Sequence, residues 1–344
     1  MDERRAMDIL SGRRRGLALT LLRTALLAAS GPYALVMRCR RALYRLGLLP
    51  RRRAGAPVIC VGNLTTGGTG KTPMVAWLVS RLREMGYRPA VLTRGYKSVA
   101  GVSDEAELLR RATGAPVFVD ADRAAAAKAA IADGADVLVM DDGFQHLRLR
   151  RDLDVVLIDA TNPFGYGHCL PRGLLREPPA ALRDADCVVV TRSDAVPGDE
   201  LAALRTRLRA LTPRASLHAA AHRPVALVDD TGATRPLNAL AGRKVCALAG
   251  IGNPEPFFRM LDNLHVRLVD RRAVGDHAEY AGPLLDMLRD GLSGCEAELV
   301  VTTEKDYVRL AAVPLPRPVW RLAVEIDLLD GRDELLSAIR RCLQ

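Results

Sequence analysis

The residues with the clearest chemistry lie at 63–74, where the chain reads NLTTGGTGKTPM. A standard phosphate-binding loop has the pattern G-x-x-x-x-G-K-[ST] between a strand and a helix. Here Gly70 and the two residues after it fit the end of that pattern, but Thr65 replaces the leading glycine. An apolar run precedes the loop, and Pro73 suits the first turn of a helix. We therefore predict a nucleotide site along Thr65, Thr66, Gly67, Gly68, Thr69, Gly70, Lys71 and Thr72.

Two side chains of this loop have specific predicted roles. Backbone N–H groups at the helix start would hold the phosphates, Lys71 would reach the β- and γ-phosphates, and Thr72 would ligate Mg²⁺. Lys71 is one of only five lysines in a chain with forty-five arginines. A lysine kept in such a chain indicates a role that needs a compact ammonium.

An acidic motif follows an apolar run in DVLVMDDGFQH (136–146). Asp141 and Asp142 would lie where that strand leaves the sheet, one in the Mg²⁺ shell and the other orienting water or ligands. Gln145 and His146 would project into the same crevice, at the carboxyl ends of the strands. Which aspartate touches the metal is not decided by the sequence.

Three uses of the bound phosphate compete. A switch GTPase is suggested by TRSD (191–194), which is similar to the guanine signature but has arginine where lysine is expected; capping of the next turn by Ser193 or Asp194 is the simpler explanation and is favoured. A partitioning-type ATPase would be an interaction protein at a membrane. A small-molecule or lipid kinase would need a base and cations around the transferred phosphoryl group. Candidates for those groups lie in SDEAELL (103–109), GDHAEY (275–280) and the basic loop LPRGLLREP (170–178), which contains Arg172, Arg176 and Glu177.

The elements that must position these residues alternate strands and helices. Continuous rather than alternating apolar runs predict strands covered on both faces, as in a parallel sheet. The predicted strands lie at 56–63, 89–95, 115–120, 135–142, 153–160, 186–194, 244–253, 265–274, 297–306 and 319–328. The predicted helices lie near 72–85, 104–112, 121–133, 199–210, 255–263, 280–291 and at the end of the chain, to 343.

The predicted fold class is α/β: a P-loop NTPase-like parallel-sheet domain and a smaller α/β C-terminal domain, with an N-terminal interfacial helix. The expected boundaries are an arm at 1–53, a nucleotide-binding core at 54–222, a turn-rich linker at 223–243 and a C-terminal domain at 244–344 that closes on the cleft.

The N-terminal arm holds the positive charge of the protein. The formal net charge is +10, and residues 1–53 contain thirteen arginines, three acids and no lysine. The longest apolar block, 16–31, is interrupted by Arg23 and is too short to span about 30 Å of hydrocarbon comfortably. Its leucines and flanking arginines suit a helix in a membrane interface, although packing on the protein would also use them.

The composition argues against two other classes of partner. Aromatic residues are 4% of the chain and the charge is confined to the arm, so we expect no nucleic-acid partner. Seven scattered cysteines without CxxC spacing predict reduced thiols in a cytosol, packed as small apolar side chains. No obligate protein partner is evident.

Together these motifs resemble a known family. GNLTTGGTGKTP, LTRGY (92–96), SDEAELL, MDDGFQH, LPRGLLREP, GIGNPEPFF (250–258), GDHAEY and VTTEKDYVRL (301–310) occur in the order seen in tetraacyldisaccharide 4′-kinases, the lipid A 4′-kinases of Gram-negative bacteria. The resemblance runs from the arm to about residue 310. It implies ATP- and Mg²⁺-dependent phosphorylation of the 4′-hydroxyl of a tetraacylated glucosamine disaccharide 1-phosphate, at the cytoplasmic face of the inner membrane, with the N-terminal helix in the bilayer surface.

The resemblance also implies roles for single residues. Asp104 resembles the family's catalytic base, and His277 the histidine that pairs with it across the domain cleft, which would require closure. The predicted catalytic set also includes Lys71 and Asp142. The predicted metal ligands are Thr72, Asp141, Asp142 and Glu177. Substrate contacts fall to Arg94, Gln145, His146, Arg172 and Arg176. The chain departs from the family pattern at Ser103, where glycine is usual, at RGYKS, and in a short segment before Asp104.

Overall fold

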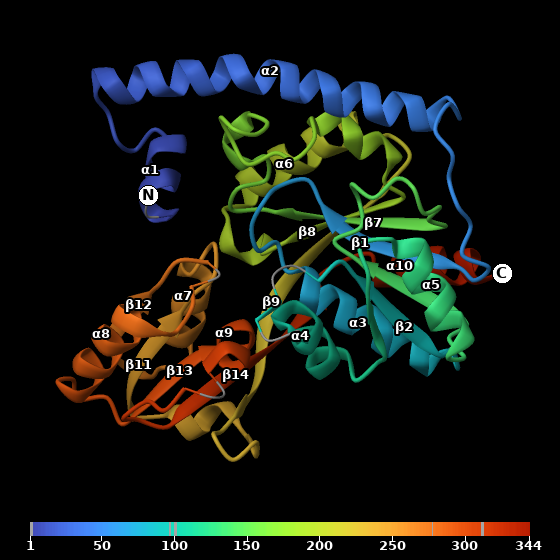
Figure 1. Ribbon diagram of the computed structural model, residues 1–344. Helices are drawn as coiled ribbons and strands as arrows, with labels where there is room; N and C mark the ends of the chain where they lie inside the picture. Colours follow the sequence, from blue (N-terminus) through green and yellow to red (C-terminus); the bar gives the residue numbers. More distant parts are fainter. Residues whose placement is uncertain (1–2, 96–97, 100–101, 277, 311–312) are drawn as a thin grey trace.

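The structure is a computed structural model that describes residues 3–95, 98–99, 102–276, 278–310 and 313–344. One twelve-stranded sheet runs through both halves of the molecule (Figure 1). In the N-terminal half the strand order is β8-β7-β1-β6-β2-β5, and all neighbours are parallel. These strands are β1 Val58–Asn63, β2 Pro89–Thr93, β5 Val117–Val119, β6 Val137–Asp141, β7 Leu153–Asp159 and β8 Cys187–Thr191.

The C-terminal half continues the same sheet through β9. β9 is parallel to β8 but antiparallel to β14, and β14, β13, β11 and β12 then follow as parallel neighbours. The strands are β9 Ser216–Val228, β10 Thr234–Arg235, β11 Lys244–Ala249, β12 Arg267–Ala273, β13 Leu299–Thr303 and β14 Val319–Leu328; a separate hairpin joins β3 Ser98–Val99 to β4 Val102–Ser103. The long β9–β14 pair is therefore the joint between two parallel half-sheets.

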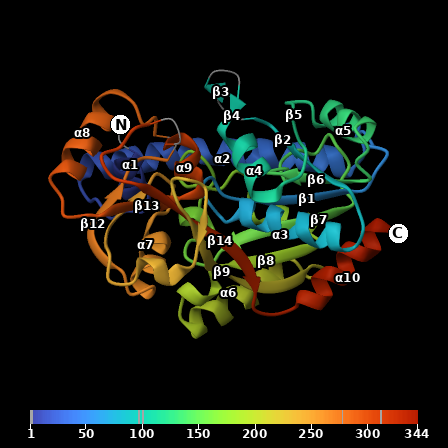
Figure 2. The same cartoon turned by 90° about the horizontal axis from the view of Figure 1, so that it is seen from below.

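Helices cover both faces of each half (Figures 1 and 2). Side chains of β1 alternate between two cores: Val58 and Cys60 face α5 and α6, whereas Ile59 and Val61 face α3, α4 and α10. In the C-terminal half, α7 covers one face and α8 and α9 the other. The helices are α1 Glu3–Leu10, α2 Leu17–Arg45, α3 Lys71–Glu84, α4 Asp104–Thr113, α5 Arg123–Ala132, α6 Gly198–Leu211, α7 Glu255–Asn263, α8 Gly282–Ser293, α9 Glu304–Leu310 and α10 Arg332–Leu343.

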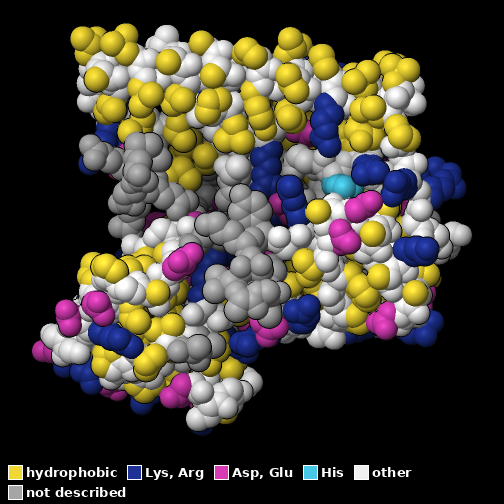
Figure 3. Space-filling model, in the orientation of Figure 1, with side chains coloured by type: hydrophobic (Ala, Val, Ile, Leu, Met, Phe, Trp, Pro, Cys, Tyr) yellow, Lys and Arg dark blue, Asp and Glu magenta, His cyan; other side chains and the backbone are white. Residues whose placement is uncertain are grey.

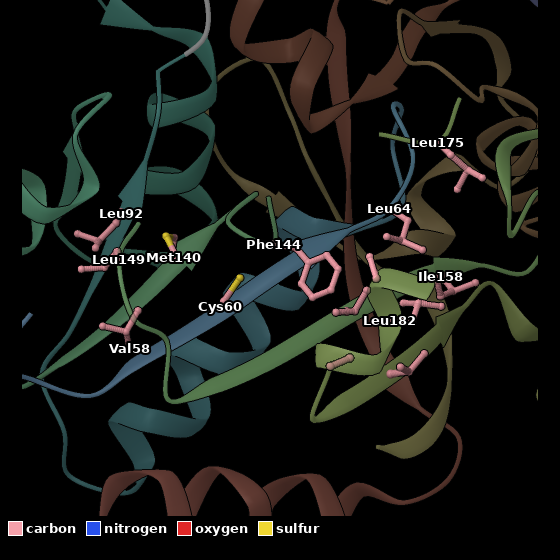
Figure 4. Packing of buried hydrophobic residues seen from close by; sticks show 14 of the residues in the cluster. Val58, Cys60, Leu64, Leu92, Met140, Phe144, Leu149, Ile158, Leu175 and Leu182 are labelled. Carbon is pink, nitrogen blue, oxygen red and sulfur yellow. The ribbon is translucent and has the colours of Figure 1, made fainter. Parts of the chain in front are cut away.

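Phe144 of the acidic motif fixes that motif against the phosphate-loop strand. Its ring is fully buried among Leu64, Ile158 and Leu182 (Figure 4). A Cβ on Gly62 would lie 2.5 Å from the Phe144 Cβ, so the two segments meet at van der Waals distance only because residue 62 is glycine. The acidic motif and the phosphate loop are thus held side by side by core packing.

The expected α/β class with an N-terminal helix agrees with this architecture, but three details differ from the sequence analysis. β9 runs unbroken across the expected boundary at 222 and into the segment expected to be a linker, because residues 220–224 and 226–228 pair with β14. α10 belongs by sequence to the C-terminal domain, yet Leu335 and Ile339 pack in the N-terminal core with Ile59. The prediction of seven buried thiols is wrong for Cys39, which is exposed on α2, and Cys295 and Cys342 are only half-buried; all seven cysteines are free.

α2 is a single helix of 29 residues that passes through Pro32 and lies along one side of the body (Figure 1). By length and composition it is able to cross a membrane, and only 6% of its most apolar stretch is buried. Its outer surface carries a row of apolar side chains (Figure 3). Exposed members on and just after the helix are Leu17, Leu21, Leu22, Leu27, Leu35, Val36, Leu43, Leu46 and Leu48.

Candidate active site

The predicted phosphate loop connects β1 to α3 with an open backbone. The loop residues Gly67 and Gly70 have φ values of +112° and +88°, which side-chain-bearing residues rarely adopt. Nothing lies within 4 Å of a Cβ built on Gly67 or Gly68, so their backbone faces free space. The loop is braced from behind by Thr191, whose hydroxyl donates to the Thr69 carbonyl at 3.0 Å. A helix start facing an open glycine turn is a fitting cradle for phosphate oxygens.

Asp142 lies between two cations at the end of β6. Arg176 Nη1 donates to both Asp142 oxygens at 2.7 and 2.9 Å, and Lys71 Nζ lies 3.4 Å from Oδ1. Burial raises the Asp142 pKa, but Lys71 and Arg176 outweigh burial and lower this pKa to about 2. Asp142 has a φ of +50°, a left-handed conformation in the residue directly after β6. Asp142 is therefore an anion at any physiological pH.

The electrostatic environment of Asp141 shifts its pKa in the direction opposite to that of Asp142. Its carboxyl is 2% exposed, and Oδ1 has no hydrogen-bond partner among the described residues. Burial and the neighbouring Glu105 raise the Asp141 pKa to about 7. A buried carboxylate oxygen without a hydrogen-bond partner among the described residues, close enough to Lys71 to interact with its charge, fits one oxygen ligand of Mg²⁺, which commonly takes one or two carboxylates plus phosphates. No group of three His, Cys, Asp or Glu side chains arranged for a metal occurs within the described residues.

Both loop and acidic motif open into one cavity of about 2150 Å³ between the two halves of the molecule. The predicted residues that line it, besides the loop from Thr66 to Thr72, are Arg94, Asp104, Asp142, Gln145, His146 and Arg176. From the other half come Gly252 and Asn253, Asp276, and Lys305 and Arg309 of α9. The structure thus brings most of the predicted site residues together at one edge of the sheet.

Asp104 begins α4 and faces the C-terminal half. Its Oδ2 accepts a hydrogen bond from Arg309 Nε at 3.3 Å, and the Asp104 side chain remains 42% exposed to the cavity. His277, the expected partner of Asp104, lies outside the described residues. Its neighbour Asp276 pairs with Lys305 at 2.6 Å and lies against Gly252, which itself approaches Gly67 of the phosphate loop. Asp104 and Asp276 therefore border the same cavity.

Two predicted residues have a different environment from the one expected. Glu177 is 1% exposed and its carboxylate pairs with Arg41 of α2. Arg172 donates from Nη1 to the Leu10 carbonyl at 2.8 Å and from its backbone to Ser30 Oγ at 3.1 Å, so it ties α1 and α2 to the loop. Neither is among the described residues that line the cavity.

In the segment TRSD, Thr191 braces the phosphate loop and Arg192 lines the cavity, whereas the last two residues do neither. Asp194 pairs with Arg223 at 3.1 Å on the surface, and the Ser193 hydroxyl donates to the Val190 carbonyl. Arg192 is buried against Asp159. Asp194 is not among the described cavity residues, so this segment offers no carboxylate to a guanine base.

Comparison with known proteins decides between the remaining alternatives. A family model described as tetraacyldisaccharide-1-P 4′-kinase, LpxK, matches residues 22–344. The chain belongs to this family.

Related proteins named tetraacyldisaccharide 4′-kinase agree over nearly the whole chain. One from Anaeromyxobacter dehalogenans (strain 2CP-C) is 44% identical over 341 residues, which cover 91% of this chain and 89% of the relative. One from Syntrophus aciditrophicus (strain SB) is 39% identical over 334 residues, covering 86% and 89%. Among solved structures, an LpxK from Aquifex aeolicus in complex with ATP is similar with a TM-score of 0.74 and 27% identity, covering 94% of this chain and all of that chain. The fold class and the kinase identity expected from the sequence are thereby confirmed.

Several side chains at this tetraacyldisaccharide-1-P 4′-kinase site were not predicted from the sequence. Arg123 at the start of α5 is 3% exposed and lies near Asp141 and Glu105. His222 of β9 is buried against Gly70, and burial followed by Arg192 lowers the His222 pKa to about 3. Glu105, which lies near both Asp141 and Arg123, could have been identified from the sequence, since it follows Asp104 in the same motif. Arg123 and His222 could not, because their approach to the site depends on which elements the sheet places together.

Proposed function

We propose that this kinase transfers the γ-phosphoryl group of ATP to the 4′-hydroxyl of tetraacyldisaccharide 1-phosphate, with Asp104 as the general base. The observation that carries the proposal is the one cavity that Asp104, the phosphate loop and Asp142 all line. A cavity of about 2150 Å³ exceeds the size of ordinary small-molecule pockets, as a disaccharide lipid beside a nucleotide requires.

In this mechanism the 4′-oxygen attacks the γ-phosphorus, the bond to the β–γ bridging oxygen breaks, and ADP leaves. The hydroxyl proton passes to the Asp104 carboxylate, whose orientation is set by Arg309. Lys71 neutralises charge that develops on the phosphoryl oxygens, and Asp142 together with Arg176 holds Lys71 in place. Mg²⁺, when bound, would supply charge neutralisation of the triphosphate, with Thr72 and Asp141 as its protein ligands. Glu177 as a further metal ligand stays a prediction.

We also propose that α2 lies in the surface of the inner membrane, on its cytoplasmic face, rather than crossing it. From its middle to its end, the helix contacts the body through Ser30, Tyr33, Arg40 and Arg41. A helix that spans the membrane would lose these contacts to lipid. The opposite side exposes leucines (Figure 3), and next to α2 the cavity is lined by Tyr33, Met37 and Leu170. Such a helix presents apolar side chains to acyl chains and arginines to anionic headgroups.

The test is transfer of radiolabelled γ-phosphate from ATP and, in parallel, from GTP to the disaccharide lipid in detergent micelles. Asp104→Asn should lower kcat by about 10²- to 10⁴-fold, the usual contribution of a general base, and leave ATP affinity within about twofold. Asp194→Asn removes a surface carboxylate outside the cavity and is the matched control. Strong preference for GTP with hydrolysis in the absence of lipid would instead assign the site to a switch GTPase.

A further inference from the structure

The carboxylate of Glu177 is held by cations from the surface helix. Glu177 is 1% exposed, and its ion pairs within the described residues are with Arg41 and, at 3.9 Å, with Arg40, both on α2. Arg41 is itself 5% exposed, although the helix around it faces solvent. A buried carboxylate without its cation is strongly unfavourable, so α2 must stay docked for this loop to keep its conformation.

Arg41 contacts both loops that form the transfer site. Its guanidinium pairs with Glu177, donates to the Phe144 carbonyl at 3.3 Å and lies 4.6 Å above the Phe144 ring. It also pairs with Asp184 at 2.6 Å. Glu177 follows Arg176, and Phe144 follows Asp142 by two residues, so one side chain of α2 bridges the two segments that carry the Asp142–Arg176 pair.

Two other α2 side chains make the same connection through the backbone. The Tyr33 hydroxyl donates to the Arg176 carbonyl at 2.9 Å, and Arg40 Nη2 donates to the Gln145 carbonyl at 3.0 Å. Gln145 in turn donates from Nε2 to the carbonyl of Asn63, which precedes the phosphate loop. These contacts form a continuous path from α2 through Arg176 and Asp142 to Lys71.

We propose that α2 is a positioning element of the phosphotransfer site, with Arg41 and Tyr33 as positioning residues that keep Arg176 on Asp142 and thereby fix Lys71. This inference rests on the function proposed above and extends it: the membrane helix contributes to the chemical step as well as to the location of the enzyme. An α2 displaced from the body would leave Glu177 unpaired and release Arg176 from its position.

The experiment uses the full-length protein in detergent micelles, without a bilayer. Binding of a fluorescent N-methylanthraniloyl ATP with Mg²⁺ is measured without lipid substrate, followed by kcat and KM for the lipid and the melting temperature. Arg41→Met should lower kcat by about 10- to 100-fold, the scale of losing an outer partner that orients site residues, and weaken nucleotide binding, with the lipid KM within about threefold. Arg41→Lys keeps the charge but not the two-pronged contact, and should recover part of kcat.

Two further variants make the test decisive. Arg38→Met removes the same charge from an exposed position of α2, and should match wild type in kcat and nucleotide affinity. Tyr33→Phe removes one hydroxyl with little risk to folding and should lower kcat by about fivefold, the scale of one hydrogen bond.

A folded Arg41→Met with wild-type kcat and nucleotide affinity would overturn the proposal, because α2 would then be only an anchor. If Arg41→Met does not fold, a wild-type kcat in Tyr33→Phe overturns it equally. If the wild-type protein fails to phosphorylate the lipid, the proposed function is refuted. That outcome is distinct from any difference in kcat or nucleotide affinity between the variants and wild type.

Discussion

Three glycines of the phosphate loop permit a graded test of its geometry by substitution with alanine. Gly68 has no positive φ, and its Cβ would meet nothing within 4 Å. Gly67 has a φ of +112° but equally open surroundings. Gly70 combines a φ of +88° with a Cβ position only 2.3 Å from His222 Nε2. Backbone strain and steric overlap are therefore separable within one loop.

The expected losses of unfolding free energy follow from these differences. Gly68→Ala should change stability by less than about 1 kcal/mol, because alanine fits without strain. Gly67→Ala should cost about 1–2 kcal/mol for a non-glycine residue at positive φ. Gly70→Ala should cost that amount plus about 1–3 kcal/mol of overpacking, since His222 is 8% exposed and has no room to move away. Lys71 follows directly, so phosphate transfer should fall in the same order.

Urea unfolding at equilibrium measures the stabilities, and the micelle assay measures transfer. In the double variant Gly70→Ala/His222→Ala the overlap is absent, so the Gly70→Ala substitution should cost only the positive-φ term, as at Gly67. The reasoning would be refuted by a Gly70→Ala protein as stable as Gly67→Ala, or by a double variant in which His222→Ala recovers nothing of the loss.

Two more predictions follow from buried side chains. Because burial and Arg192 lower the His222 pKa to about 3, this residue binds more protons in the unfolded chain than in the folded one between about pH 6.5 and pH 3. The contribution of His222 to stability should therefore fall as pH decreases through this range, by at most about 1.4 kcal/mol per pH unit. In urea titrations, wild type should lose stability relative to His222→Gln as pH decreases, and His265→Gln, at an exposed histidine, is the control. Asp306 is fully buried and accepts hydrogen bonds from the Gly250 backbone, Tyr280 and Thr303, so Asp306→Ala should cost about 3–5 kcal/mol by the same measurement, against about 1 kcal/mol for Tyr280→Phe, and equal losses would contradict this account.

The strands and helices were largely readable from local patterns. Apolar runs such as 153–160 and 186–194 marked buried parallel strands, and Gly-Lys-Thr marked the start of α3. No strand was predicted where β9 lies, and residues 223–228 include a proline and look turn-like. They form a strand because β14 supplies the antiparallel partner. α10 returns to the N-terminal core for a similar reason, since its apolar face matches a surface formed by distant strands.

The candidate site likewise contains residues that local motifs predict and contacts that depend on the tertiary structure. The placement of Lys71 and Thr72 in one motif, and of Asp141 and Asp142 in another, was predictable because each motif directly follows an apolar strand. Arg309 on Asp104, in contrast, joins residues 205 positions apart in the chain, and no local pattern encodes such a pair. Glu177 was identified as important, but its contact with Arg41 required knowing where α2 lies.

The sequence by itself determined the nucleotide chemistry, the order of elements and the family of this kinase, because each depends on residues close together in the chain. Tertiary structure alone decided which charges are paired, which carboxylate stays unpartnered and which face of α2 meets the body. Those properties depend on distances across the sheet and on exclusion of water, and both arise only when segments far apart in the chain pack together.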